Sequence, residues 1–343
     1  MLYYFSELNI RGNHAGTKAR NDVEAILKES GAKPLNSKQF TLRSDENDNI
    51  YSNVNSRISL SKLFFEVMKV RNQAVLLQYP MLAFDFEEQF YRAIAKKNRL
   101  IFLVHDIHSL RIPNASKLKK EVELLNLADC LIVHNRFMKE KLLELGVTVS
   151  NVLCLQLFDY LYNNNNANNC ITIKDDIAFA GNLDKSMFLP SLINENPSIR
   201  FALYGPVKEK RFLNHNATHY GSFFPDEIPN ELNARFGLVW DGDSLNGASG
   251  ALGEYTRINN PHKLSLYLAS GIPVIVWRQA AVAEYVINKN IGLAVDRIDD
   301  LEGLLKDVTE NDYIKMKLSV DSIRNEIIQG NFLKRVLQQL DVN

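Results

Sequence analysis

The chain has 343 residues, 46% of them hydrophobic, and its 40 Lys and Arg residues balance its 40 Asp and Glu residues. This length suggests two domains of ordinary size, and the zero net charge argues against a dedicated nucleic-acid-binding protein, which usually carries a basic excess. Cys130, Cys154 and Cys170 lack the spacing of a disulfide framework or a zinc site. We therefore expect a reducing, cytoplasmic location.

The first half of the chain alternates short apolar runs with amphipathic stretches. The expected strands are residues 2–5, 74–78, 100–104, 130–133 and 152–157. The expected helices are residues 18–29, 58–70, 84–97, 118–127 and 136–145, with Gly31 and Gly146 as stop signals. Residues 9–17 and 31–55 are polar and predict loops, the second with a short strand. This alternation predicts a parallel sheet with helices on both faces.

An Asn-rich segment, residues 163–170, predicts a linker, because it is low in complexity and a poor helix or strand former. The alternation then resumes with strands at 177–180, 201–204, 236–240, 273–277 and 292–295. Helices are expected at 280–287 and 301–308, and two more over 312–340 that break near Gly330. The sequence therefore predicts two doubly wound, Rossmann-like α/β domains, residues 1–162 and 171–330. The last helix, about 331–343, could pack back on the first domain.

The two domains are expected to face a central cleft, because ligands of such sheets bind beyond the carboxyl ends of the strands. The strongest signal lies between the apolar runs 236–240 and 273–277. Pro261 suits the first turn of a helix that Gly271 ends. The helix N-terminus offers N–H groups and a partial positive charge, and here it also carries His262 and Lys263. We predict that a nucleotide diphosphate binds there.

The loop before this helix has two further features. Asp241 and Asp243 form an Asp-Gly-Asp sequence directly after a strand. Three interpretations stay open: a metal site, hydrogen bonding to sugar hydroxyls or to the acceptor, and a plain turn. The Gly-rich run 247–250 could let backbone N–H groups approach phosphate, or could simply form a loose loop.

Several stretches in order along the chain resemble one family. They read YYFSELNIRGNHAGTKARND at 3–22, VHDIHSLR at 104–111, FDYL at 158–161, AGNL at 180–183, YGSF at 220–223, GLVWDGDS at 237–244 and NNPHKLSLYLASGIPVIVW at 259–277. The overall plan resembles a GT-B glycosyltransferase, with the acceptor bound by the N-terminal half and the sugar nucleotide by the C-terminal half. More narrowly, the chain resembles bacterial β-1,6-galactofuranosyltransferases of O-antigen synthesis, and more distantly the glucosyltransferase that extends O-GlcNAc on serine-rich-repeat adhesins.

The resemblance implies roles for individual residues. Lys263 matches a nucleotide-binding lysine, Lys185 takes the place of a basic residue that contacts the diphosphate, and Phe223 falls where the adhesin enzyme has a tyrosine near the base. Thr17 or Ala15 lies near an acceptor-side position. The expected donor site also includes further residues of the same stretches: Gly181, Asn182, Tyr204, Asp241, Asp243, Asn260, Pro261 and His262.

One departure from related enzymes concerns the ribose. Many retaining GT-B enzymes carry a ribose-binding glutamate three residues after the helix lysine, where this chain has Leu266. Other groups must hold the ribose here, and Glu254 is the candidate.

Transfer of a sugar with inversion needs one base, which should come from the N-terminal half. Asp106, directly after a predicted strand end, is the first candidate, with His105 orienting it, and His14 in the first loop is the alternative. The competing structural interpretations are that Asp106 caps a helix or pairs with Arg111, that the lysines are solvated surface residues, and that His262 is a capping residue.

The resemblance predicts a metal-independent, inverting transfer from a UDP-sugar, most simply UDP-galactofuranose, to a glycan or glycoside acceptor. No metal or other cofactor is expected, and no nucleic acid. The adhesin enzyme implies a homo-oligomer, and a lipid-linked acceptor leaves open a peripheral contact with the inner face of the membrane. The alternatives are a UDP-glucose-dependent glucosyltransferase acting on an adhesin, a sugar-nucleotide epimerase, and a GT-B protein without catalysis.

Overall fold

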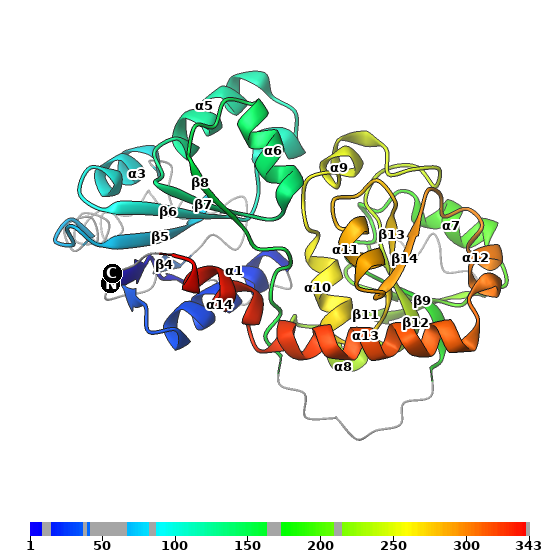
Figure 1. Cartoon of the computed structure of the whole chain (residues 1–343). Helices are drawn as coiled ribbons and strands as arrows, with labels where there is room; N and C mark the ends of the chain where they lie inside the picture. The colour runs from blue at the N-terminus through cyan, green and yellow to red at the C-terminus, as the bar shows by residue number, and fades with distance from the viewer. Residues whose placement is uncertain are drawn as a thin grey trace. The chain divides into compact units, whose positions relative to one another are not determined.

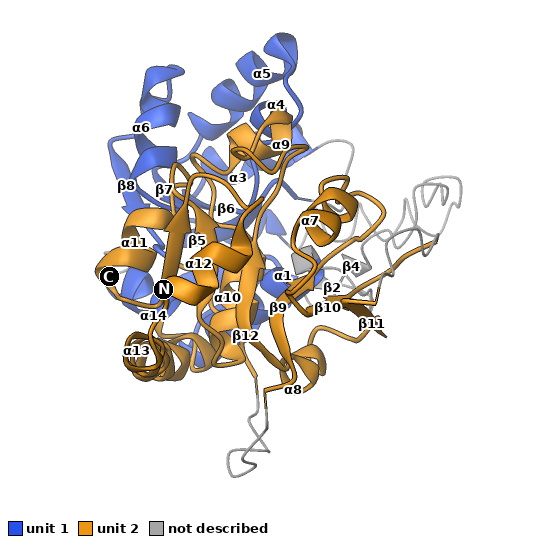
Figure 2. Cartoon of the chain, turned by 90° about the vertical axis from the view of Figure 1, so that its right-hand side faces the viewer, with its two compact units in different colours: residues 1–156, 332–343 blue, residues 157–331 orange. Residues whose placement is uncertain are grey.

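The computed structural model describes residues 1–8, 15–36, 40–41, 67–81, 87–162, 173–208 and 215–340. The chain divides into two compact units, residues 1–156 with 332–343 and residues 157–331 (Figure 2). Each unit is built on one six-stranded sheet with helices around it (Figure 1), and all strand pairs within both sheets are parallel. The predicted doubly wound architecture is confirmed for both halves.

In the first unit the strand order is β3-β1-β5-β6-β7-β8. The strands are β1 Leu2–Tyr4, β3 Lys33–Pro34, β5 Ala74–Tyr79, β6 Arg99–Val104, β7 Cys130–Val133 and β8 Asn151–Cys154, beside a separate pair, β2 Glu7–Leu8 and β4 Phe40–Thr41. The helices are α1 Ala15–Glu29, α3 Glu87–Ala95, α4 His108–Arg111, α5 Ala115–Leu125, α6 Arg136–Glu144 and, from the end of the chain, α14 Asn331–Gln338. Lys334 of α14 pairs with Glu29 of α1 at 3.0 Å.

In the second unit the strand order is β11-β10-β9-β12-β13-β14. The strands are β9 Asp175–Ala180, β10 Phe201–Tyr204, β11 Ala217–Gly221, β12 Ala234–Val239, β13 Val274–Trp277 and β14 Gly292–Val295. The helices are α7 Leu189–Glu195, α8 Ile228–Glu231, α9 Gly250–Tyr255, α10 His262–Ala269, α11 Ala283–Asn288, α12 Leu301–Asp307 and α13 Glu310–Ile328. The order reverses between β9 and β12, and such a switch point is where open α/β sheets bind ligands.

The predicted elements are largely confirmed, and the strands at 130–133, 201–204 and 292–295 have the predicted bounds. The prediction missed β11, because this edge strand is half exposed and has no continuous apolar run. Helices were expected between the strands of this half without stated bounds, and α7 and α8 lie there. Helix α9 was not expected, because its two glycines had indicated a loop. Most of the predicted helix at 58–70 and the Asn-rich linker lie outside the described residues.

Helix α10 packs unusually close to the sheet of the second unit. Every residue from Leu264 to Ala269 is buried. A Cβ added at Gly237 of β12 would lie 2.3 Å from the Tyr267 ring, so a side chain there would push the helix away. At the other end of α10, Arg324 of α13 donates to the Ala269 carbonyl at 2.8 Å, and Lys317 donates to the Gly271 carbonyl. The helix is therefore fixed along its length.

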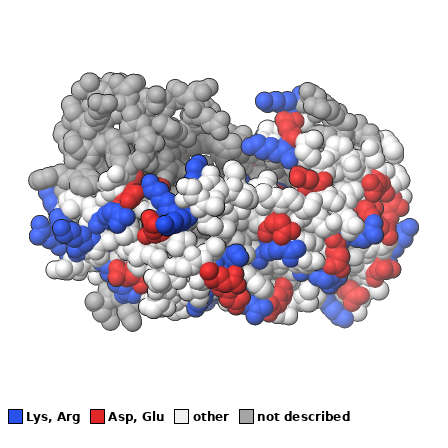
Figure 3. Space-filling view, turned by 90° about the horizontal axis from the view of Figure 1, so that it is seen from above, with Lys and Arg blue, Asp and Glu red and all other residues white. Residues whose placement is uncertain are grey.

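Charge is divided unevenly between the units. The first contains 24 Lys and Arg against 18 Asp and Glu, and the second contains 16 against 22. Figure 3 shows Lys and Arg side chains crowded at the left-hand end of that view and both signs mixed elsewhere. The zero net charge of the whole chain conceals this division. No helix among the described residues is both long and apolar enough to cross a membrane.

A buried histidine holds the turn that follows β6. His134 is 2% exposed, and its Nε2 lies 3.1 Å from the carbonyl oxygens of both Val104 and His105. Two carbonyl acceptors require a protonated Nε2. Burial lowers the pKa of His134 to about 4, although the charge of Asp106 acts in the opposite direction. The ring is therefore neutral in the folded protein at pH 7.

This histidine predicts a pH dependence of stability. Its pKa is about 4 when folded and 6.5 when unfolded, so the unfolded chain binds the extra proton as the pH falls below 6.5. The free energy of unfolding should fall by up to about 1.4 kcal/mol per pH unit toward pH 4, in total about 3 kcal/mol. Urea unfolding from pH 7.5 to 4.5 measures this. The variant His134→Gln lacks the titration, and parallel curves for both proteins would contradict the prediction.

Candidate functional site

The candidate site lies at the N-terminus of α10. Pro261 is the cap residue rather than part of the first turn, with φ −62° and ψ 133°, and the helix begins at His262. The helix therefore starts one residue later than predicted. No side chain caps this end within the described structure. Lys263 is then the second helical residue, where the backbone N–H groups have no intrahelical acceptor.

The Lys263 side chain lies across the carboxyl ends of β9 and β12. Its Nζ is 2.8 Å from Asp241 Oδ1, 3.4 Å from the Trp240 carbonyl oxygen and 4.6 Å from the centre of the Phe179 ring. A Cβ added at Gly181 would lie only 3.2 Å from Lys263 Cε. Glycine at this position therefore gives the lysine its path over the strand end. The switch point of the second unit carries one partly buried ammonium group, 19% exposed.

The charges at this point suit an anion. A lysine near a helix N-terminus is repelled by the helix dipole, and the Asp241 carboxylate offsets that repulsion. An ammonium group has three N–H donors. Asp241 and the Trp240 carbonyl accept two of them, so the third can donate to a ligand. The Asp241–Lys263 pair also fixes where the charge lies.

The loop after β9 is built around Asn182. Its Oδ1 accepts a hydrogen bond from the Lys185 backbone N–H at 3.1 Å, and its carbonyl accepts one from the Ser186 hydroxyl at 3.0 Å. Lys185 itself is exposed. The neighbouring loop approaches closely, because a Cβ on Gly205, at φ +130°, would lie 1.9 Å from the Gly181 carbonyl oxygen. Asn182 thus shapes the turn that presents Lys185.

The predicted aromatic residues lie at the end of β10 and just after β11. Tyr204 is fully buried, and its hydroxyl donates to the Glu231 carbonyl at 2.9 Å. Its ring stacks on Tyr220 at 5.3 Å and meets the Phe223 ring at 6.2 Å. Phe223 is half-buried. Tyr204 can therefore support Phe223 but does not itself present a polar group.

The Asp-Gly-Asp sequence forms a tight turn against the start of α9. Gly242 has φ +125°, and a Cβ there would lie 2.5 Å from the Ser249 carbonyl oxygen. Asp243 is exposed, with its carboxylate against Gly250, whereas Asp241 points to Lys263. Among the residues that the structure describes, no group of three or more His, Cys, Asp or Glu side chains is arranged to hold a metal ion. The two aspartates thus face different partners.

Three further residues predicted for the donor site are Glu254, His262 and Asn260. Glu254 is exposed on α9 and pairs with Arg257 at 2.6 Å. His262 packs its ring against Tyr160 at 5.2 Å and Phe158 at 6.0 Å, on the segment that enters the second unit. Asn260 is buried. Their predicted contacts with a donor stay predictions.

In the first unit the candidate base lies directly after β6. Asp106 Oδ2 accepts a hydrogen bond from Arg111 at 2.8 Å, so the ion pair considered from the sequence is present. Ile107, not Asp106, precedes the first residue of α4. His105 Nε2 lies 2.7 Å from Gln78 Oε1 at the end of β5. Thr17 lies in the first turns of α1, and His14 falls outside the described residues.

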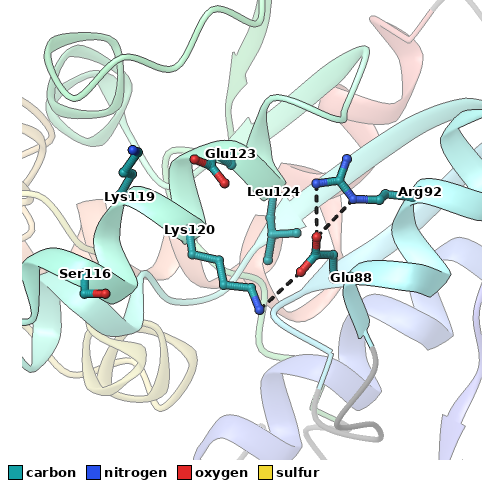
Figure 4. A pocket seen from close by; sticks show the side chains of 7 residues that line it. All are labelled: Glu88, Arg92, Ser116, Lys119, Lys120, Glu123 and Leu124. Atoms are coloured by element: carbon teal, nitrogen blue, oxygen red, sulfur yellow. Dashed lines mark hydrogen bonds and ion pairs between the residues drawn. The ribbon is translucent and has the colours of Figure 1, made fainter.

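A separate polar hollow of about 280 Å³ lies between α3 and α5 (Figure 4). Its centre is Glu88, which pairs with Arg92 at 3.0 Å and with Lys120 at 3.2 Å. The remaining lining residues are Ser116, Lys119, Glu123 and Leu124. Glu88, Arg92 and Lys120 satisfy one another at an exposed surface, and no residue predicted for the site lines the hollow.

Sequence reasoning missed three residues that build the α10 site. Phe179 supplies the ring under Lys263, Gly237 leaves the room for Tyr267, and Tyr267 bonds the Ala180 N–H at 2.8 Å. The only sequence signals were a glycine within an apolar strand and an aromatic residue one turn after the lysine. Both are also typical of ordinary core packing.

Comparison with known proteins identifies relatives that match both halves of the chain. Glucosyltransferase 3-like domain models match residues 3–157 (N-terminal domain) and 177–340 (C-terminal domain). The β-1,6-galactofuranosyltransferase WbbI of Escherichia coli is 30% identical, covering 99% of this chain and 98% of that protein. Glucosyltransferase 3 of Streptococcus gordonii is 27% identical, covering 95% and 94%.

Solved structures show the same fold. The sucrose-phosphate synthase of Thermosynechococcus elongatus matches with a TM-score of 0.63 at 14% identity, over 99% of this chain and 98% of that one. The lipopolysaccharide outer core galactosyltransferase WaaB matches with a TM-score of 0.58 at 13% identity, over 99% and 100%. These likenesses confirm the predicted GT-B fold. The chain belongs to the glucosyltransferase 3-like family of glycosyltransferases.

Proposed function

We propose that this glycosyltransferase moves galactofuranose from UDP-galactofuranose to a sugar hydroxyl of a cell-surface glycan precursor, with inversion at the anomeric carbon. The observation that carries the donor half is the Lys263 ammonium at the switch point of the second unit, 2.8 Å from Asp241. The choice of sugar is supported by the 30% identity to a β-1,6-galactofuranosyltransferase over nearly the whole chain.

The donor half of the reaction needs positive groups that stabilise the leaving diphosphate. Negative charge grows on UDP as the bond to the sugar breaks, and fixed donors lower the energy of that state. Lys263 would donate to a phosphate oxygen, together with backbone N–H groups at the start of α10. Lys185, on the turn shaped by Asn182, would add a second cation. These groups supply the charge without a metal, which is part of the proposal.

The nucleoside would lie toward β10. Phe223 offers a half-buried ring for the uracil, and the buried Tyr204 ring packs against it. Asp243 and Glu254 are exposed carboxylates on the loop and helix that follow β12, and are the candidates for sugar or ribose hydroxyls. Glu254 would have to leave Arg257 to take that role.

The acceptor half needs a base to take the hydroxyl proton. We assign this role to Asp106, with His105 beside it. Arg111 binds Oδ2 of Asp106, so Oδ1 is the oxygen that would accept the proton. His105 would orient Asp106, and Thr17 and His14 would help to hold the acceptor. His14, in the first loop of the sequence, stays the alternative base.

The runner-up is transfer of glucose from UDP-glucose, supported by the 27% identity to glucosyltransferase 3 of Streptococcus gordonii. Ring size is selected by the shape of the sugar pocket, so the two donors share the same diphosphate site. A homo-oligomer and a peripheral membrane contact through a lipid-linked acceptor remain parts of the proposal.

Replacing the lysine tests the diphosphate site. The variant Lys263→Ala should bind UDP more weakly by about 1.5–3 kcal/mol, or about 10- to 150-fold, because it loses a charged hydrogen bond. Isothermal titration calorimetry measures the dissociation constant. Lys289→Ala, at an exposed lysine after α11, is the control and should bind as the wild type does. Equal affinities for all three proteins would remove Lys263 from the site.

A panel of donors tests the sugar. The wild-type enzyme is given UDP-galactofuranose, UDP-galactopyranose or UDP-glucose with simple alkyl glucosides, and transfer is detected by mass spectrometry. Only UDP-galactofuranose should give product. A large excess of EDTA should leave the rate unchanged, because cationic side chains supply the charge. Transfer from UDP-glucose alone would support the runner-up, and rescue by manganese after EDTA would return the Asp-Gly-Asp turn to a metal role.

Replacing the carboxylate tests the base. The variant Asp106→Asn keeps the shape and a hydrogen bond to Arg111 but cannot take a proton, so kcat should fall by about 10²- to 10⁴-fold. The KM for the donor should stay the same, because Asp106 lies in the acceptor-binding unit. Glu123→Gln on α5 is the matched control. An undiminished kcat would point to His14 or another base.

A further inference from the structure

The ladder between β9 and β12 stops before the two strands end. Their last paired residues are Ala178 and Gly237. On the other side of β9 the pairing continues, because Ala180 pairs with Tyr204 of β10 and the Gly181 N–H donates to the Tyr204 carbonyl at 2.9 Å. At the switch point, therefore, the end of β9 is held by a neighbouring strand on one side only.

Helix α10 supplies the missing partner on the β12 side. The Ala180 N–H, which points away from β10, donates to the hydroxyl oxygen of Tyr267 at 2.8 Å. Tyr267 is fully buried, and its ring occupies the space that Gly237 leaves on β12. A side-chain oxygen from a helix thus takes the position that a strand carbonyl would otherwise fill. Without it, a buried N–H group would have no acceptor.

Tyr267 and Lys263 act on adjacent points of the same strand end. They are one helical turn apart and so share a face of α10. The Lys263 side chain passes Gly181 so closely that a Cβ added to that glycine would lie 3.2 Å from Lys263 Cε. Tyr267 accepts a hydrogen bond from the residue just before, Ala180. The tyrosine therefore sets the distance between α10 and the end of β9, which is the space through which the lysine reaches Asp241.

We propose that Tyr267 is a positioning residue for the diphosphate site: its hydroxyl fixes the end of β9 against α10 and so keeps the Lys263 ammonium and the turn at Asn182 in register. The proposal rests on the proposed role of Lys263 in holding the diphosphate. Tyr267 touches no substrate itself, since it is fully buried beneath the site.

The same unit contains a matched control. Tyr313 of α13 is also buried, and its hydroxyl bonds a backbone group of β12, the Arg235 carbonyl, at 3.2 Å. Arg235 lies at the amino end of its strand, whereas Ala180 lies at the carboxyl end of β9. The two tyrosines thus make comparable contacts at opposite ends of the parallel strands, and only the carboxyl end holds the proposed diphosphate site.

The experiment compares Tyr267→Phe with Tyr313→Phe and the wild type. Inhibition constants of UDP and of uridine are measured separately, because only UDP carries the diphosphate. Tyr267→Phe should raise the inhibition constant of UDP by about tenfold, the loss expected for a misplaced charged hydrogen bond. The inhibition constant of uridine should stay the same. Tyr313→Phe should leave both unchanged. The KM for the acceptor should not change in either variant.

Amide hydrogen exchange gives a second readout on the folded protein. The Ala180 N–H should exchange faster in Tyr267→Phe than in the wild type, while the N–H groups of β13 keep their protection. Unchanged UDP affinity in Tyr267→Phe, or equal losses for UDP and uridine, would overturn the proposal and leave Tyr267 as a core residue. If Lys263→Ala also binds UDP normally, the diphosphate site itself is wrong, so the two failures are distinguishable.

Discussion

The structure of the second unit depends on how closely α10 approaches the carboxyl ends of β9 and β12. That approach is possible because two positions lack a Cβ: Gly237, against which the Tyr267 ring packs, and Gly181, which Lys263 crosses. A side chain at Gly237 would need the helix or the strand to move, and one at Gly181 would displace the Lys263 side chain, since packed interiors have little free volume. The same closeness places an ammonium group over the strand ends, where α/β sheets bind their ligands. Packing and charge at this site therefore have one cause.

Charged side chains interact with both ends of α10. At its C-terminus, where carbonyl groups carry partial negative charge, Arg324 and Lys317 donate to the last carbonyls, and burial lowers the pKa of Lys317. At its N-terminus, Lys263 has the unfavourable sign, and Asp241 offsets it at 2.8 Å. A single ion pair that is still partly open to solvent contributes little to stability, on the order of 1 kcal/mol. Lys263 is thus poorly explained by folding, whereas a lysine held for an anionic ligand fits its position.

Much of the fold could be predicted from the sequence, because apolar runs and helix stop signals are local. Strands such as 130–133 and 201–204 match, and the break near Gly330 is present at φ +74°. The contacts of the site are not local. Tyr267 meets Ala180, Lys263 meets Asp241, and Glu254 of α9 pairs with Arg257. Periodicity predicts that a residue faces the core, but not which strand end it will meet.

In the proposed mechanism the two chemical tasks of a glycosyl transfer fall on separate units, and each unit holds its own groups in place. In the first, the turn after β6 is fixed by His134, which donates to backbone carbonyls, and by Gln78, which bonds His105. Arg111 occupies one oxygen of Asp106 and so orients the other. A base that is oriented before the acceptor binds loses little entropy in the transition state. The leaving-group side follows the same rule, because Asp241 and Tyr267 fix Lys263 and the end of β9 without help from the substrate.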